Sequence, residues 1–330
     1  MATVAGPAAS LPIDIGTPSG DRLAMPLFRR ADGDLVRDLP PVRGIVPYLM
    51  RRRNESAVYH EARYDVGRAR RWLRAYNRAH EERATLFHLL LYACTRALHL
   101  RPGLNRFVSG GRVYARRGVS VAFAAKREMS DEAPFATVKL AFGAEETLGE
   151  SVRRVAEAVD AGRAATPRAI DREAALVMSL PGFLVSFLTR LAARLDAWNL
   201  LPGFMMRDDP FFSSLFLANL GSVGLSDTFH HLYEYGTVSI FGVMGTVRPA
   251  LEAGPSGAER REILQVRFTL DERVNDGFYA ARSLRIAQDV LEDPDRYLGP
   301  PDAPVVPTPE AWAALRARGE ARTPAEPAPG

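Results

Sequence analysis

Lysine is almost absent from this chain of 330 residues. Of its 43 cationic side chains only Lys126 and Lys139 are lysines, and all the others are arginines. A composition rich in Arg, Ala and Pro is typical of a genome rich in G and C, and the formal net charge is only +4. The hydrophobic and charged fractions are those of a soluble globular protein. We therefore expect no nucleic-acid partner.

Cysteine and histidine are also scarce. The single cysteine, Cys94, excludes an internal disulfide framework. It shares an apolar helical face with Phe87, Leu90 and Leu91, which is typical of a core residue rather than a nucleophile. No cluster of His, Cys and carboxylate side chains has metal-ligand spacing, so we expect no metal. No Gly-rich phosphate-binding loop is present either.

Long apolar runs are missing as well. Residues 174–189 carry no charge, but sixteen residues broken by Pro181-Gly182 are too few to cross a bilayer. The first sixteen residues have no basic start followed by an apolar run. We therefore expect no signal peptide and a cytoplasmic location.

Composition divides the chain into three parts. Residues 1–42 are rich in Gly, Pro and Asp without periodicity and predict an arm with little structure. Residues 43–298 form the expected domain, which contains an apolar helical insertion at 162–209. Residues 299–330 are rich in Pro and Ala and predict a flexible tail with one helical turn around Trp312.

Periodicity predicts a mixture of helices and strands. Asp65 and Thr85 precede two amphipathic helices, and Thr147 with Glu150 forms a capping box before a third. Gly110-Gly111 predicts a hairpin turn. Strands are expected within 105–125, 135–142, 211–219, 237–247 and 263–270.

The strand ending at Leu270 leads into the most informative stretch, Asp271-Glu272-Arg273-Val274-Asn275-Asp276-Gly277, from which a helical pattern leaves. This stretch resembles the Asp-His-Arg-x-x-Asp-Gly signature of CoA-dependent acyltransferases related to chloramphenicol acetyltransferase. The closest likeness is to the catalytic domains of 2-oxo acid dehydrogenase dihydrolipoamide acyltransferases. The family's His is its general base, and Glu272 stands in its place.

Three further stretches carry the resemblance in the same order. Residues 43–50 are similar to the family's opening helix, and Pro102-Gly103-Leu104-Asn105 resembles the Pro-x-Leu-Asn that closes its helix. Residues 215–224 match a second signature, a strand ending Ser-Asn-Leu-Gly. The family's Ser there donates a hydrogen bond to the tetrahedral oxyanion. Ala218 replaces it here, and Asn219 follows.

The resemblance implies an α/β fold, the chloramphenicol acetyltransferase-like two-layer sandwich with a mixed sheet. It also implies a homotrimer whose active sites lie between two subunits, with CoA or acyl-CoA as a substrate. No lysine lies in anything like a lipoyl-attachment hairpin, so we expect no lipoyl domain. The protein would then be a stand-alone acyltransferase acting on a small-molecule acyl donor and acceptor.

The free-energy cost of proton transfer differs between a His base and a Glu base. Proton transfer from a thiol to an imidazole is unfavourable by about two pKa units, or roughly 2.7 kcal/mol. Transfer from a thiol to a carboxylate is unfavourable by about four pKa units, or roughly 6 kcal/mol. Burial could raise the pKa of Glu272 and close most of that gap. Loss of the oxyanion donor costs about a further hundred- to thousand-fold in rate. Two hypotheses remain open, an acyltransferase with Glu272 as base and a catalytically silent trimeric binding or scaffold protein.

The candidate site residues are Glu272, Asp276, Asn219 and His231. In the family the Asp276 position forms a salt bridge that shapes the turn, and Arg43 is the candidate partner. His230-His231 is the one histidine pair, and His231 is an alternative base.

Two more features have competing readings. Arg51-Arg52-Arg53 is a solvated basic face or a contact for CoA phosphates or an acidic partner. The apolar residues 174–206 are a hairpin packed on the domain, a lid over an acyl site, or a surface that docks on a membrane or a protein.

Overall fold

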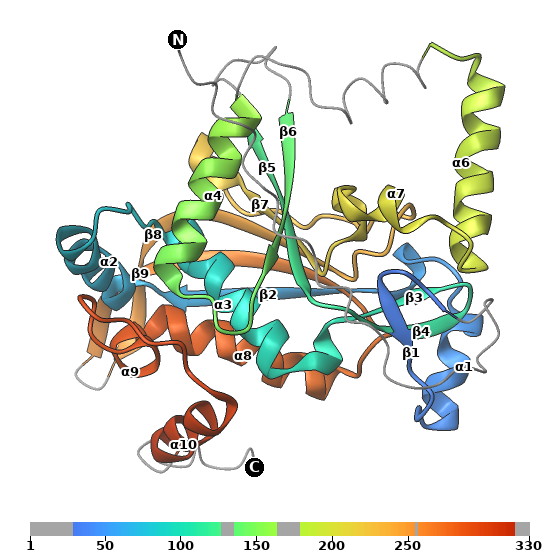
Figure 1. Cartoon of the computed structure of the whole chain (residues 1–330). Helices are drawn as coiled ribbons and strands as arrows, with labels where there is room; N and C mark the ends of the chain where they lie inside the picture. The colour runs from blue at the N-terminus through green and yellow to red at the C-terminus, as the bar shows by residue number, and fades with distance from the viewer. Residues whose placement is uncertain (1–28, 127–134, 164–178, 255–256, 321–330) are drawn as a thin grey trace, which may run out of the picture.

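A six-stranded mixed sheet forms the centre of the protein (Figure 1). The structure, a computed structural model, describes residues 29–126, 135–163, 179–254 and 257–320. The strand order in the sheet is β2-β9-β8-β7-β5-β6. The strands are β2 (Ala57–Asp65), β5 (Val119–Lys126), β6 (Phe135–Phe142), β7 (Leu215–Asn219), β8 (Ile240–Gly254) and β9 (Gly257–Asp271).

The short strand β7 makes the sheet mixed. It pairs in parallel with both of its neighbours, with Leu217 opposite Phe123 of β5 and opposite Gly242 of β8. All other pairs in this sheet are antiparallel. Gly242 lies where an added Cβ would come within 2.9 Å of the Leu217 side chain, so the two strands approach closely at this position.

Helices pack on one face of the sheet and form the second layer. They are α2 (Gly67–Ala79), α3 (Leu86–Leu100), α4 (Leu148–Arg163) and α8 (Gly277–Glu292). Alternate residues of β9, Leu264, Val266, Phe268 and Leu270, are buried in the core that these helices share with the sheet. Cys94 of α3 is buried in the same core. The predicted two-layer α/β sandwich with a mixed sheet is confirmed.

A second, smaller sheet has the order β1-β4-β3. Its strands are β1 (Gly33–Leu35), β3 (Arg106–Ser109) and β4 (Arg112–Arg116). Gly110 and Gly111 join β3 to β4 with φ of 56° and 74°, which is the left-handed turn that their sequence predicts. Residues 33–35 lie in the range expected to be an arm with little structure, and that expectation is wrong for them. Pairing with β4 orders this segment, a long-range contact that composition does not reveal.

The segment after residue 299 also differs from its prediction. Helix α9 (Pro294–Leu298) is followed by α10 (Pro309–Glu320), where composition predicts one helical turn in a flexible tail. Trp312 of α10 is buried, and its ring stacks on Tyr297 with the centroids 4.7 Å apart. Aromatic burial therefore anchors α10 against the domain.

The expected insertion contains α6 (Gly182–Ala197) and α7 (Gly203–Arg207), whereas residues 164–178 lie outside the described part of the chain. Figure 1 shows α6 standing away from the large sheet, beside the small one. Lys139 of β6 donates to the carbonyl oxygens of Met206 and Asp209, at 2.8 and 3.1 Å, and so fastens the end of this segment. No helix among the described residues is long and apolar enough to cross a membrane.

Candidate active site

The turn between β9 and α8 is built on a buried ion pair. The Asp271 carboxylate accepts from Arg273 Nε at 2.8 Å and from Nη2 at 2.7 Å. Ser56 Oγ donates to the same carboxylate at 3.0 Å, and Arg273 Nη1 donates to the carbonyl of Arg51 at 3.1 Å. The pair thereby connects the turn to the chain between α1 (Pro41–Leu49) and β2.

Glu272 lies between the two paired residues, and its backbone is fixed from both sides. Its N–H donates to the carbonyl of Ser56 at 2.9 Å, and its carbonyl accepts from Arg43 Nη2 at 3.0 Å. Glu272 is exposed. The turn therefore presents this side chain from a rigid backbone position.

The expected partner of Asp276 is not the observed one. Arg43 contacts the carbonyl of Glu272, and Asp276 instead begins α8, where its Oδ1 accepts from the N–H of Tyr279 at 2.7 Å. The expected Arg43–Asp276 salt bridge is therefore corrected. The buried salt bridge that shapes the turn joins Asp271 to Arg273.

A cavity of about 150 Å³ opens beside Glu272. Glu272 and Asp276 both line it, so the structure brings together two of the four candidate site residues. The remaining wall is largely apolar and comes from β2, the residues before β3, β8, β9 and α8. It includes Val58, Leu104, Ser239, Ile240, Leu270, Val274 and Ala280.

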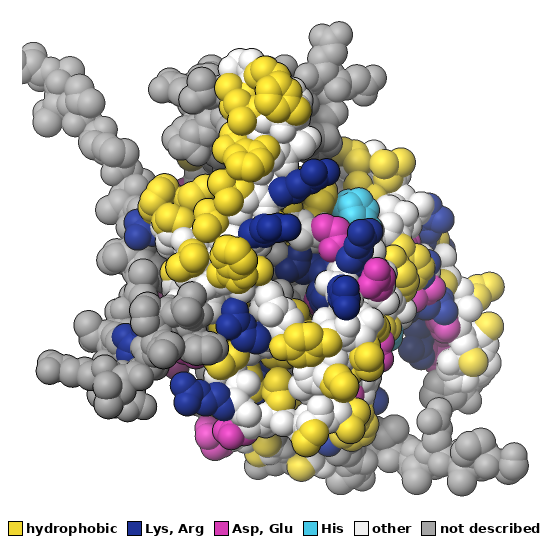
Figure 2. All heavy atoms as spheres, turned by 90° about the vertical axis from the view of Figure 1, so that its right-hand side faces the viewer, with side chains coloured by type: hydrophobic (Ala, Val, Ile, Leu, Met, Phe, Trp, Pro, Cys, Tyr) yellow, Lys and Arg dark blue, Asp and Glu magenta, His cyan; other side chains and the backbone are white. Residues whose placement is uncertain are grey.

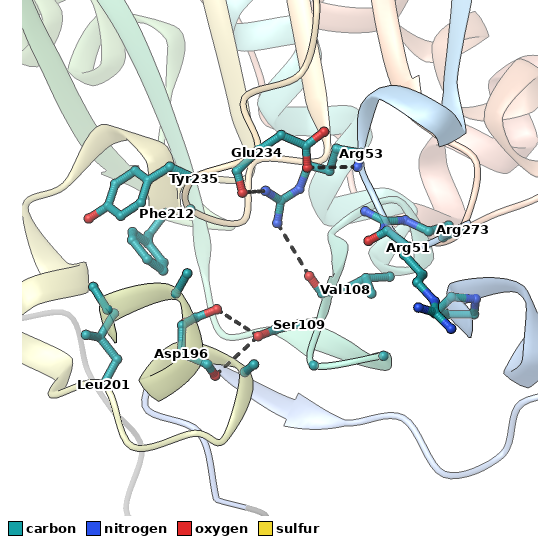
Figure 3. A pocket seen from close by; sticks show the side chains of 17 residues that line it. Arg51, Arg53, Val108, Ser109, Asp196, Leu201, Phe212, Glu234, Tyr235 and Arg273 are labelled. Atoms are coloured by element: carbon teal, nitrogen blue, oxygen red, sulfur yellow. Dashed lines mark hydrogen bonds between the residues drawn. The ribbon is translucent and has the colours of Figure 1, made fainter. Parts of the chain in front are cut away.

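A second cavity, of about 240 Å³, lies on the other side of the ion pair, with Arg273 in its wall (Figure 3). The end of α6 closes one side, where Asp196 accepts from Ser109 Oγ at 2.7 Å. Arg53 and Glu234 form the opposite side. Sequence reasoning missed Asp196 and Glu234, because neither lies in a motif and only the fold places them here.

The three arginines after α1 have different roles. Arg53 is buried and donates to the carbonyls of Tyr233 and Glu234, at 2.9 and 3.0 Å. Burial lowers the pKa of this guanidinium. Arg52 is exposed, and Arg51 is exposed while also lining the larger cavity. The basic triplet is therefore part structural and part surface, and Arg51 is the one of the two exposed arginines that lines the larger cavity.

The second motif lies away from the turn around Glu272. Ala218 is half-buried at the end of β7 and packs with an apolar cluster that includes Phe216 and Phe241. The Asn219 side chain accepts from the N–H of Ser222 at 3.1 Å and so begins a short 3-10 turn. Neither Ala218 nor Asn219 lines the cavity beside Glu272.

The histidine pair lies over β8. The His230 ring stacks on Phe241 with centroids 3.9 Å apart, and the His231 ring stacks on His230 at 4.5 Å. Desolvation lowers the pKa of His230, whereas His231 is exposed. His231 does not line the cavity beside Glu272, so the alternative base and the turn do not share this cavity.

The described residues contain no group of His, Cys, Asp and Glu that could hold a metal ion. Comparison by sequence finds no matching family model and no matching curated protein.

Comparison of folds finds clear similarity. The dihydrolipoamide acetyltransferase of Azotobacter vinelandii is 15% identical with a TM-score of 0.52, covering 79% of this chain and 93% of its own. Its structure comes from work on the role of a serine, a histidine and an asparagine in its catalytic mechanism. The cubic core of a pyruvate dehydrogenase complex is 14% identical with a TM-score of 0.51, covering 79% and 93%.

A chloramphenicol acetyltransferase is 13% identical with a TM-score of 0.51 and is covered in full by 79% of this chain. The similarity thus extends over nearly the whole length of each of these proteins. The chain has the chloramphenicol acetyltransferase-like fold that dihydrolipoamide acyltransferase catalytic cores share.

Proposed function

We propose that this protein is a stand-alone acyltransferase that transfers an acyl group between CoA and a small acceptor, with Glu272 as its general base. The observation that carries the proposal is the placement of Glu272. Two backbone hydrogen bonds fix this residue in the turn between β9 and α8, and Glu272 lines a largely apolar cavity.

In the proposed reaction the Glu272 carboxylate accepts the proton of the acceptor's nucleophilic group. That group forms a bond to the thioester carbonyl of acyl-CoA and gives a tetrahedral oxyanion. The C–S bond then breaks, and the CoA thiolate leaves with the proton that Glu272 returns. Ala218 has no hydroxyl, so a backbone N–H or a water would have to stabilise the oxyanion.

The proposed assembly is a trimer. Glu272 and Ala218 line different parts of one protomer, and the family's active site lies between two subunits. A neighbour's β7 would then complete the wall beside Glu272. Two of the fold neighbours are cores of multienzyme complexes, which fits oligomerisation.

The CoA phosphates would lie near Arg51. Its guanidinium lines the larger cavity, which adjoins the turn through Arg273. An exposed arginine at the edge of a cavity suits a phosphate because its planar group donates several hydrogen bonds at once.

The test is binding and turnover by the purified full chain. Titration calorimetry with CoA and acetyl-CoA should show binding, and release of free thiol from acetyl-CoA with small amine and alcohol acceptors should show transfer. Glu272→Gln should abolish transfer and keep binding, because the amide cannot accept the proton. Transfer that is unchanged in Glu272→Gln would refute Glu272 as base.

A second function, a catalytically silent binding or scaffold protein, has its own support. Glu272 is exposed in the protomer and Ala218 lacks the hydroxyl that the family uses. Under this hypothesis CoA or acyl-CoA binds without turnover, or does not bind at all. The same calorimetry and thiol release separate the two functions.

A further inference from the structure

An apolar stripe runs along the outer face of α6, the helix that stands away from the large sheet. Phe183, Phe187, Leu191 and Trp198 recur at four- and seven-residue steps and so share one helical face. Phe183 is 77% exposed, Phe187 59% and Trp198 56%. In Figure 2 hydrophobic side chains follow this helix in a nearly continuous line with basic side chains beside it.

The opposite face of α6 holds the helix in place. Ala192 and Leu195 pack against a small core of Leu201, Met206 and Phe212. Asp196 forms an ion pair with Arg30 and accepts from Ser109. The stripe is therefore turned outward by contacts on the other side of the helix, and no residue of α6 is buried.

The exposed charges of α6 have one sign. Arg190 and Arg194 are exposed on α6, and Arg207 is exposed at the end of α7. Phe204 of α7, 70% exposed, extends the apolar surface. Asp196, the one acidic residue of α6, forms an ion pair with Arg30, and an exposed Asp208 follows Arg207. We call Phe183, Phe187, Leu191, Trp198, Phe204, Arg190, Arg194 and Arg207 the α6 patch.

The charge and the length of α6 distinguish between the possible partners of the α6 patch. A second copy of α6 would bring arginines against arginines with no unpaired carboxylate from either helix. A helix of 16 residues is about 24 Å long and too short to span a bilayer. It suits a position in the plane of the interface, where aromatic rings enter the acyl boundary and arginine stems extend to the headgroups.

We propose that the α6 patch docks the protein on a membrane surface that contains anionic phospholipid. The apolar stripe supplies the insertion, and Arg190, Arg194 and Arg207 supply attraction to the headgroups. This inference does not depend on acyl transfer, because none of these residues belongs to the turn around Glu272.

The test is flotation of the full chain with vesicles of phosphatidylcholine alone or with phosphatidylglycerol at one part in three. The wild type should float with the anionic vesicles and much less with the neutral ones. Phe183→Ser combined with Phe187→Ser should lower the affinity for anionic vesicles about tenfold or more, because two rings no longer insert. Arg190→Glu should lower it about fivefold or more.

Matched controls lie on other faces of the protein. Leu251→Ser replaces an equally exposed apolar side chain on the β8–β9 hairpin, and Arg78→Glu replaces an exposed arginine of α2. Neither should change flotation by more than about twofold. Circular dichroism should show that every variant keeps its helices, which separates lost docking from lost folding.

Fluorescence gives a second readout. Trp72 and Trp312 are buried, so a blue shift of the emission on anionic vesicles should come from Trp198 and vanish in Trp198→Phe, which should still float. Failure of the wild type to float, or flotation that the Phe183/Phe187 variant retains, would overturn the proposal. Equal flotation on neutral vesicles would overturn the role of the arginines. A lower oligomer mass in the Phe183/Phe187 variant with unchanged flotation would assign the stripe to contacts between copies.

Discussion

The Asp271 carboxylate accepts two hydrogen bonds from the Arg273 guanidinium, at 2.8 Å from Nε and 2.7 Å from Nη2, and Glu272 lies between the two residues in the chain. Both side chains are almost completely buried. This pair separates the cavity beside Glu272 from the larger cavity beside α6, since Asp271 lines the first and Arg273 the second. Any loosening of the pair would move the candidate base.

Breaking this pair should destabilise the fold. Asp271→Asn leaves the buried Arg273 without its anion, which should lower the free energy of unfolding by about 3–5 kcal/mol. Asp34→Asn is the control, because its pair with Arg117 is exposed and should cost less than about 1 kcal/mol. Urea unfolding measures both. Equal losses in the two variants would show that the buried pair contributes no more to stability than the exposed pair.

Restoring the family's pair of residues should distinguish the two proposed functions. If the protein is silent but keeps an open channel, Glu272→His with Ala218→Ser should create transfer from acetyl-CoA, because imidazole and hydroxyl supply the base and the oxyanion donor. If the protein is an enzyme with Glu272 as base, the double variant should leave or lower the native rate. Thiol release is the measurement, and each single variant is its control.

The trimer should depend on α1. Val42, Ile45, Tyr48 and Leu49 are all exposed in the protomer, which leaves an apolar face uncovered. We predict a trimer by light scattering at micromolar concentration. Ile45→Asp with Tyr48→Asp should shift it toward the monomer, because the charges would have to be buried. Leu251→Asp on the β8–β9 hairpin should leave the mass unchanged, and a monomeric wild type would contradict the prediction.

The contact between α8 and α10 should depend on pH. Burial raises the pKa of Asp289 from 3.8 to about 6, and Arg316 Nε of α10 lies 3.4 Å from its Oδ2. The folded state therefore binds a proton between about pH 4 and 6 that the unfolded state releases. This contribution to stability is present below pH 4 and is lost as the pH rises through 6.

Asp289→Asn removes this titration. The variant should be more stable than the wild type at pH 7, by about 1–3 kcal/mol, and should differ little from it at pH 4. Thermal unfolding at both pH values measures the change. A difference of the same size at both pH values would show that the carboxyl does not titrate in this range.

The sequence predicts the elements that carry their own pattern. The strand before Asp271 has an apolar pattern, Gly110-Gly111 has the preference of a hairpin turn, and Thr147 with Glu150 has the pattern of a capping box, which the structure forms. β2 was missed because it is an edge strand with only Ala62 and Tyr64 buried. Its polar side chains give no strand signal, and only pairing with β9 reveals it.

The sequence locates the site, but it does not predict which residues contact one another there. The motif gives the place of Glu272. The partner of Asp276 is predicted wrongly, because the fold brings Arg43 to the carbonyl of Glu272 and leaves Asp276 as the cap of α8. Composition predicts Trp312 in a nearly unstructured tail, because its stacking partner Tyr297 belongs to another helix and leaves no signal in the tail itself. Contacts set by tertiary packing decide each of these cases.

The parallel placement of β7 also bears on where this fold can gain new segments. Pairing of Val121 with Leu215 closes a chain loop of roughly ninety residues. The entropy of closing such a loop grows only with the logarithm of its length, about 0.6 kcal/mol for each doubling. Between β6 and β7 the chain can therefore lengthen at little thermodynamic expense, and α6 and α7 lie in that interval.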